Sequence, residues 1–135
     1  MKEQQRRLLL LVEDHQATRD VLRRILALCG WEILEAATIA EGLARLDPPP
    51  DCIVLDLDLP DGPGEVLLRK VRVERIPTRV VVSSGTDDRA RLSEVSYMRP
   101  DAVLQKPLDS EGLRRICEMV PLPPRRDCMQ GDKWP

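Results

Sequence analysis

The 135-residue chain contains very few aromatic side chains: two tryptophans, one tyrosine and no phenylalanine. A hydrophobic core built from this sequence must therefore be aliphatic, and an aromatic surface on which nucleic-acid bases could stack is not expected. Positive charge is not in excess either, because 21 Lys and Arg residues are matched by 23 Asp and Glu residues, for a formal net charge of −2. The composition therefore argues against direct binding of nucleic acid.

Hydrophobic runs are short, and the run at residues 8–12 is far shorter than the roughly 20 residues that a membrane-spanning helix needs. No membrane insertion is therefore expected. The chain does not open with a basic and then apolar leader, so the expected location is cytoplasmic. The four cysteines, Cys29, Cys52, Cys117 and Cys128, are widely spaced and include no Cys-x-x-Cys pair. They are expected to be reduced thiols, three of them in the core.

Short apolar segments alternate with segments of helical periodicity along most of the chain. This alternation predicts an α/β fold with a parallel sheet and right-handed crossover connections. The predicted strands are residues 8–12, 31–35, 52–55, 80–82 and 102–104, and the predicted helices are residues 17–28, a short helix opened by Thr38, residues 65–73, residues 87–96, and a final helix opened by Asp109 or Ser110. Residues 1–120 are predicted to form one domain, followed by a flexible tail at 121–135, which holds four of the twelve prolines.

Polar and charged side chains follow four of the five predicted strands. They are Glu13 and Asp14 after the first strand, Asp56 after the third, Ser84 after the fourth and Lys106 after the fifth. Because the carboxyl ends of parallel strands meet at one edge of the sheet, these side chains are expected to lie close together. Clustered carboxylates repel one another unless a proton or a cation intervenes, and hard oxygen ligands suit Mg²⁺.

Taken singly, each of these residues also has an ordinary structural explanation. A carboxylate after a strand often forms a turn or caps a helix, so Glu13 alone fits either interpretation. Ser84 alone fits a cap for the next helix, and Lys106 alone fits a solvated charge. The combination favours a site, because Asp14 and Asp56 both follow apolar strands and would be forced close together.

These strand ends lie within four distinctive segments: LLLVEDH at 9–15, IVLDLDLPDGPGE at 53–65, VVVSSG at 80–85 and LQKPLD at 104–109. In this order, and over residues 7–120, the segments resemble the receiver domains of response regulators in two-component signal transduction. The resemblance implies a (βα)5 flavodoxin-like fold, in which a five-stranded parallel sheet of order 2-1-3-4-5 carries helices on both faces.

The resemblance also implies a role for each acidic residue. Asp56 resembles the carboxylate that takes a phosphoryl group from a sensor histidine kinase or a phosphotransfer protein. Asp14 resembles a direct ligand of Mg²⁺ (or Mn²⁺), and Glu13 resembles the neighbour that acts through water. Asp58 falls where the family uses a backbone carbonyl as a metal ligand.

The remaining site residues follow the same family pattern. Lys106 resembles the residue that neutralises the acyl phosphate, and its peptide bond to Pro107 is implied to be cis. The phosphate-binding hydroxyl is assigned to Ser84, which lies 28 residues after Asp56 and 22 before Lys106. Ser83 is then expected to point to the other face of the strand.

Two positions depart from the family pattern. Val103 stands where an aromatic residue is usual, and residues 99–102 (RPDA) replace the usual Gly-Ala. The aromatic switch of the family is therefore not expected, because Val103 is too short to swing between buried and exposed states. The loop after Ser84 and the polar helix at 87–96 are expected to move on phosphorylation instead.

The predicted function is that of a stand-alone receiver, phosphorylated on Asp56, which signals through an unidentified protein partner or a second copy of itself. Residues 121–135 are too few to form an output domain. The chain is expected to accept and lose a phosphoryl group without being a turnover enzyme. Two other interpretations stay open: a pseudo-receiver scaffold that is never phosphorylated, and a haloacid-dehalogenase-type phosphatase, whose nucleophile motif resembles residues 56–59 (DLDL). The phosphatase is disfavoured because that family carries the motif on its first strand.

Overall fold

The computed structural model describes residues 7–119; the predicted tail, Val120 and Cys128 lie outside the described residues. Its seven strands are β1 (Arg7–Val12), β2 (Trp31–Ala36), β3 (Cys52–Asp56), β4 (Asp58–Leu59), β5 (Gly62–Pro63), β6 (Arg79–Ser84) and β7 (Ala102–Gln105). Five of them form a parallel sheet in the order β2-β1-β3-β6-β7, which confirms the predicted order. The short antiparallel pair β4–β5 was not predicted from the sequence.

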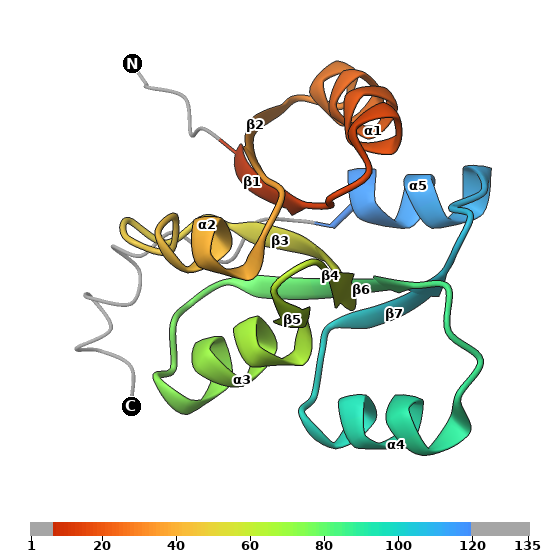
Figure 1. Cartoon of the computed structure of the whole chain (residues 1–135). Helices are drawn as coiled ribbons and strands as arrows, with labels where there is room; N and C mark the ends of the chain where they lie inside the picture. Colours follow the sequence, from red (N-terminus) through yellow and green to blue (C-terminus); the bar gives the residue numbers. More distant parts are fainter. Residues whose placement is uncertain (1–6, 120–135) are drawn as a thin grey trace, which may run out of the picture.

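Helices cover both faces of this sheet. They are α1 (Gln16–Leu28), α2 (Ile39–Leu43), α3 (Glu65–Val73), α4 (Arg89–Tyr97) and α5 (Ser110–Cys117). Figure 1 shows α1 and α5 on one side of the sheet and α2, α3 and α4 on the other, so helices cover both faces, as predicted. Among the described residues, no helix is long and apolar enough to cross a membrane.

The core consists of two hydrophobic clusters, one on each face of the sheet. Successive residues of β1 alternate between them, so Leu9 and Leu11 pack toward α1 and α5, whereas Leu10 and Val12 pack toward the other helices. Trp31 is the single aromatic side chain in these clusters, so the core described here is aliphatic, as the composition requires. Burial on both faces explains why β1 and β3 read as continuous apolar runs.

Side-chain caps determine where the helices begin. The Thr38 hydroxyl accepts a hydrogen bond from the Glu41 N–H (3.0 Å), which opens α2 as predicted. Helix α4 begins two residues later than predicted because the Asp88 carboxylate accepts hydrogen bonds from two backbone N–H groups of its first turn. Asp109, one of the two residues predicted to open α5, accepts from the Gly112 N–H (2.8 Å).

The expectation that the cysteines are reduced thiols is wrong for two of them. Cys29 and Cys117 form a disulfide that joins the ends of α1 and α5. The two residues are 88 positions apart in the sequence, and only the packing of α1 beside α5 brings them together. Cys52 is free and buried, as expected, and burial raises the pKa of its thiol to about 12.

Gly64 allows the start of α3 to approach the end of β3 closely. Its N–H donates to the Leu57 carbonyl (2.8 Å), and a Cβ at this position would collide with the backbone carbonyl oxygen of Asp56. The neighbouring atoms belong to the backbone and cannot rotate away. A side chain at Gly64 would therefore displace the segment that carries Asp56.

We expect Gly64→Ala to lower the free energy of unfolding by about 1–3 kcal/mol, as overpacking typically does. Gly85→Ala is the matched control, because a Cβ at Gly85 would come no closer than 3.9 Å to the Lys106 side chain. Urea denaturation of both variants measures the difference. An unfolding midpoint of Gly64→Ala equal to that of the unaltered chain would contradict the close approach.

Candidate functional site

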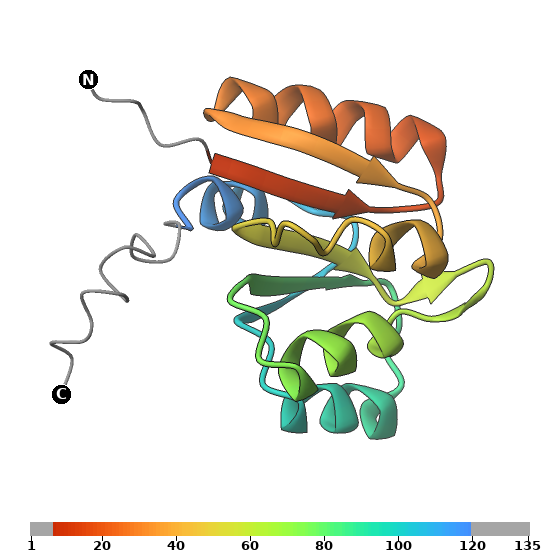
Figure 2. The same cartoon turned by 90° about the vertical axis from the view of Figure 1, so that its left-hand side faces the viewer.

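The predicted site residues meet at one edge of the sheet. Glu13 follows β1, Asp56 ends β3, Ser84 ends β6 and Lys106 follows β7. In Figure 2 the arrowheads of β1, β2 and β3 point to the same side of the molecule, and the β4–β5 hairpin extends from that side. The parallel sheet thus brings together residues that are up to 93 positions apart.

Three carboxylates form an acidic cluster at this edge. One oxygen each of Glu13, Asp14 and Asp56 lies within 4.8 Å of the others. Glu13 and Asp56 are only 3% and 4% exposed, whereas Asp14 is exposed. Hard oxygen donors of which one faces solvent suit a divalent cation that keeps several of its waters.

The Lys106 ammonium lies between two of these carboxylates. Its Nζ is 2.8 Å from Glu13 Oε1 and 3.1 Å from Asp56 Oδ2. Burial alone would lower the pKa of Lys106, but the hydrogen bond with Glu13 and the charge of Asp56 outweigh burial and raise it. Lys106 is therefore a fixed positive charge beside the Asp56 carboxylate. The peptide bond from Lys106 to Pro107 is cis.

The Asp56 carboxylate is held on both of its oxygens. Oδ1 accepts a hydrogen bond from the Asp58 N–H (3.0 Å), and Oδ2 faces the Lys106 ammonium. Burial nevertheless raises the pKa of Asp56, and the nearby charge of Glu13 raises it further. The hydrogen bond from the Asp58 N–H and the charge of Lys106 lower the pKa, but they do not outweigh burial. The negative charge of Asp56 is thus incompletely compensated, which favours binding of a further cation.

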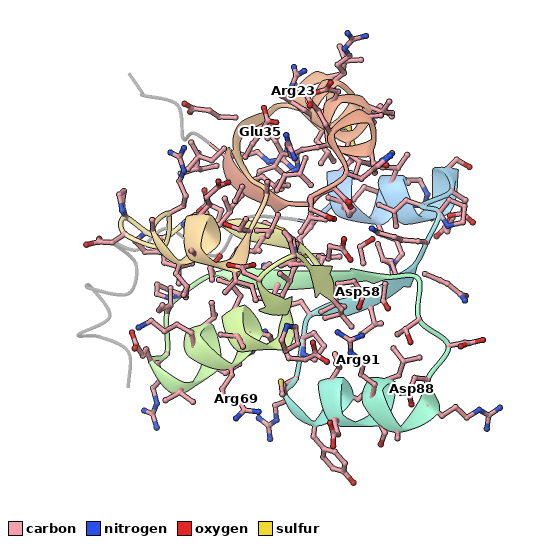
Figure 3. The ribbon with its side chains drawn as sticks, viewed as in Figure 1. Arg23, Glu35, Asp58, Arg69, Asp88 and Arg91 are labelled. Atoms are coloured by element: carbon pink, nitrogen blue, oxygen red, sulfur yellow. A yellow bond between two sulfur atoms is a disulfide. The ribbon has the colours of Figure 1, made fainter. Side chains whose placement is uncertain are left out.

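Arg19 on α1 holds the turn that carries Glu13 and Asp14. Its guanidinium donates to the Glu13 carbonyl (2.7 Å) and to the Glu35 carboxylate at the end of β2 (3.0 Å). Arg23 pairs with the same carboxylate at 3.1 Å, and Figure 3 shows Arg23 and Glu35 near one another on α1 and β2. The acidic turn is therefore anchored to its neighbouring strand and helix.

The two serines of β6 face opposite sides of the sheet, as alternation along a strand predicts. Ser84 Oγ accepts from the Thr86 N–H (3.0 Å), and Ser84 lines a cavity of about 310 Å³ with Leu92 of α4 and Val103 of β7. Ser83 lines a separate groove instead, and its hydroxyl has no hydrogen-bond partner among residues 7–119. Val103, which replaces the usual aromatic, is 41% exposed.

The groove that Ser83 lines has a volume of about 720 Å³ and lies between α1 and α5. Val21 and Ile25 of α1 and Leu113 of α5 form apolar walls, and Lys106 lies at its edge. Its size falls within the range of binding pockets, about 300–1,000 Å³. The groove therefore gives an apolar approach to the side of the site that Lys106 occupies.

Sequence reasoning missed Arg91 of α4 as a residue of this region. Its guanidinium pairs with Asp58 Oδ1 (2.8 Å) and with the Glu65 carboxylate (2.7 Å), and it donates to the Leu57 carbonyl (2.7 Å). Figure 3 shows Arg91 between α4 and the segment that carries Asp58. No local pattern could have identified these contacts, because the partners lie 26–34 residues earlier in the chain.

Comparison with known proteins gives one family. The family model of the response regulator receiver domain matches residues 9–118. Among curated proteins, the chain is 35% identical over 99 residues to the KDP operon transcriptional regulatory protein KdpE of Escherichia coli K12. That match covers 73% of this chain and 44% of KdpE, so the chain spans less than half the length of this relative.

Solved structures show the same fold. A CheY-like response regulator receiver domain protein from Methanospirillum hungatei is 25% identical, with a TM-score of 0.76, over 97% of this chain and 100% of that one. A response regulator protein from Burkholderia pseudomallei is 20% identical, with a TM-score of 0.73, over 94% of this chain and 72% of that one. The Burkholderia structure contains a phosphorylated aspartic acid, a calcium ion and citrate.

Because the negative charge of the Asp56 carboxylate is incompletely compensated, we expect Asp56→Asn to stabilise the protein in the presence of a chelator. A raised pKa means that the folded state holds the proton more tightly than the unfolded chain, whose Asp pKa is about 3.9. Asp56 therefore weakens stability progressively as the pH rises through its folded-state pKa. At neutral pH we expect urea denaturation to show a gain of about 1–2 kcal/mol, within the usual desolvation penalty of a buried polar group.

Asp61→Asn is the control, because the pKa of Asp61 is shifted in the opposite direction to that of Asp56. Asp61 is exposed, and hydrogen bonds from the Ile39 and Ala40 N–H groups lower its pKa. The ionised Asp61 carboxylate therefore stabilises the folded state above the pKa of Asp61 in the unfolded chain, and this stabilisation is lost as the pH falls through the pKa of Asp61 in the folded state. Asp61→Asn should therefore give no gain in stability at neutral pH. Identical pH profiles of stability for the unaltered chain and Asp56→Asn would refute the argument.

Proposed function

The chain belongs to the response regulator receiver domain family, and on that premise we propose that Asp56 accepts a phosphoryl group from a histidine kinase or phosphotransfer protein. The observation that carries the proposal is the Lys106 ammonium, which lies 3.1 Å from Asp56 Oδ2 and 2.8 Å from Glu13. Phosphoryl transfer depends mainly on positioning and on positive charge around the equatorial oxygens. This geometry supplies one such charge directly beside the acceptor oxygen.

Receiver domains bind a divalent metal ion at an acidic pocket, and Glu13, Asp14 and Asp56 form such a pocket here. The residues fit the ion, because their oxygens lie within 4.8 Å of one another and the charge of Asp56 is incompletely compensated. We assign Asp14 and Asp56 as direct ligands of Mg²⁺ or Mn²⁺, with the Asp58 carbonyl, and Glu13 as a ligand through water. A bound ion would supply positive charge to the transferred phosphoryl group in addition to that of Lys106.

The transfer itself forms a bond between an Asp56 oxygen and phosphorus and breaks the bond from phosphorus to the donor's histidine nitrogen. Asp56 needs no base, because the carboxylate is already the anion. Lys106 neutralises one equatorial oxygen of the product. Ser84, whose hydroxyl now accepts from the Thr86 N–H, is proposed to turn and donate to another.

The donor protein is proposed to approach along the groove between α1 and α5. This groove opens beside Lys106, and Val21 on its α1 wall is 55% exposed. The output is proposed to leave on the opposite side, where the cavity between Ser84, Leu92 and Val103 gives α4 room to move. A protein partner or a second copy of the chain would read the changed surface.

Neither rival function is favoured by a specific observation. A phosphatase would use both acids of the motif at residues 56–59, but the Asp58 side chain pairs with Arg91 rather than facing the acceptor. A scaffold would need none of the site's chemistry, yet Glu13, Asp56 and Lys106 are in direct contact. Phosphoryl acceptance accounts for these contacts better than either alternative.

We expect a small phosphodonor with Mg²⁺ to add the mass of one phosphoryl group to the intact chain, labile at alkaline pH. Asp56→Asn should abolish the addition, because an amide lacks the anionic oxygen that attacks phosphorus. Intact-mass spectrometry measures both, with Asp61→Asn as the control that changes an exposed carboxylate outside the site. Equal modification of Asp56→Asn and the unaltered chain would rule out Asp56 as the acceptor.

Asp14→Ala is expected to weaken Mg²⁺ binding more than Glu13→Ala, because only Asp14 is assigned as a direct ligand. The loss should exceed about tenfold, since losing even an outer partner commonly has that effect at a metal site. Calorimetric titration with Mg²⁺ gives the affinities, and Asp20→Ala, on the first turns of α1, controls for loss of one charge. Unchanged affinity in Asp14→Ala would remove it from the ligand set.

A further inference from the structure

Every nitrogen of the Arg91 guanidinium is engaged with residues that surround the acceptor. Nη1 pairs with Asp58 Oδ1 (2.8 Å), and Nε and Nη2 pair with the two Glu65 oxygens (2.7 and 3.0 Å). Nη2 also donates to the Leu57 carbonyl (2.7 Å). A bidentate pair with a carboxylate is the most geometrically specific interaction that Arg forms. We call these four residues the Arg91 cluster: Leu57, Asp58, Glu65 and Arg91.

The Arg91 cluster is the main polar attachment of α4 to the site. Val95 is the one buried side chain of this helix, so apolar packing holds α4 only weakly. Glu65 is at the start of α3 and is largely buried, with a side chain 14% exposed, and its hydrogen bonds with Arg91 lower its pKa. Arg91 therefore connects three elements: α4, the start of α3 and the segment after β3.

The contacts of Arg91 lead directly to Asp56. The Asp58 N–H that donates to Asp56 Oδ1 (3.0 Å) belongs to the peptide between Leu57 and Asp58, and Arg91 holds the Leu57 carbonyl of that same peptide. Because the peptide unit is planar, fixing its carbonyl also fixes the direction of its N–H. Arg91 thus helps to orient one oxygen of the Asp56 carboxylate through a single rigid unit, together with the Gly64 N–H that donates to the same Leu57 carbonyl (2.8 Å).

Arg91 also offsets the charge of Asp58. Without this guanidinium, the carboxylate of Asp58, two residues after Asp56, would lose its ion-pair partner. Small phosphodonors are anions, so an uncompensated charge at Asp58 would oppose their approach. Position and charge both depend on the same side chain.

We propose that Arg91 is a positioning residue for phosphoryl transfer to Asp56, acting through the Leu57–Asp58 peptide and the Asp58 carboxylate. This inference rests on the proposed function of Asp56. Its consequence is that the position of α4 and the reactivity of the acceptor are coupled, because the same guanidinium contacts both. A movement of α4 that withdraws Arg91 would leave the Leu57 carbonyl to the Gly64 N–H alone (2.8 Å) and would loosen the peptide whose N–H orients Asp56.

The test compares three variants by the rate of phosphoryl uptake from an acyl phosphate at saturating Mg²⁺, followed by intact mass. Arg91→Met keeps the side-chain length and removes every hydrogen bond, whereas Arg91→Lys keeps the charge without the planar fork. Arg89→Met removes a positive charge from the same helix at an exposed position. Thermal unfolding confirms that each variant is folded.

Arg91→Met should slow uptake by at least about tenfold, within the range that misplacement of a reacting group produces. Arg91→Lys should recover only part of the rate, and Arg89→Met should stay within about twofold of the unaltered chain, as for most surface changes. A wild-type rate in folded Arg91→Met would overturn the inference. So would full recovery in Arg91→Lys, or equal slowing in Arg89→Met, because either shows that charge alone matters.

A second variant covers the case in which Arg91→Met does not fold. Glu65→Gln weakens the ion pair that anchors Arg91 and leaves Asp58 unchanged. It should slow uptake by about threefold or more, which corresponds to a rise of roughly 0.7 kcal/mol or more in the activation free energy. An unchanged rate of uptake overturns the inference. Failure of the proposed function looks different. In that case the unaltered chain takes up no phosphoryl group, and the inference fails together with the proposed function. If instead the unaltered chain and Arg91→Met take up the phosphoryl group at the same rate, the proposed function stands and only the inference fails.

Discussion

The contact of the Lys106 ammonium with Glu13 and Asp56 is the interaction on which the functional end of this protein depends. Both carboxylates are almost fully buried, and a buried charge is tolerated only when it is paired. Lys106 follows β7 at the edge of the sheet, whereas its partners belong to β1 and β3 near the middle. One cation thereby joins the ends of three strands and leaves Asp56 with a charge that is only partly compensated.

Much of this arrangement could be predicted from the sequence, because it follows from local patterns and one topological rule. Short apolar runs identify the strands, and side chains that directly follow parallel strands must share an edge. Asp56 and Lys106 are placed together by that rule without any knowledge of their contact. The β2-β1-β3-β6-β7 order came instead from the family resemblance, since alternation alone does not determine which strands are neighbours.

Two of the features that could not be predicted depend on pairs of residues that are distant in sequence. Arg91 has no local signal, because an arginine on a polar helix is usually solvated and its partners lie on α3 and after β3. The link between Cys29 and Cys117 spans 88 residues and follows from helix packing alone. The β4–β5 hairpin has strands of two residues each, which are too short to show alternation. For Arg91 and the disulfide, tertiary structure supplies information that no sequence window contains.

The Cys29–Cys117 link also divides the site by connectivity. It closes a covalent ring that includes Asp56, Ser84 and Lys106, whereas Glu13 and Asp14 precede the ring. A single peptide-bond cut inside the ring leaves the segments of Asp56, Ser84 and Lys106 in one covalent piece. A cut within α1 instead leaves β1 and the acidic pair held by non-covalent contacts alone, among them the pairing of β1 with β2 and β3 and the ion pair of Glu13 with Lys106. The acidic pair of Glu13 and Asp14 is therefore the part of the site that the chain secures by folding alone.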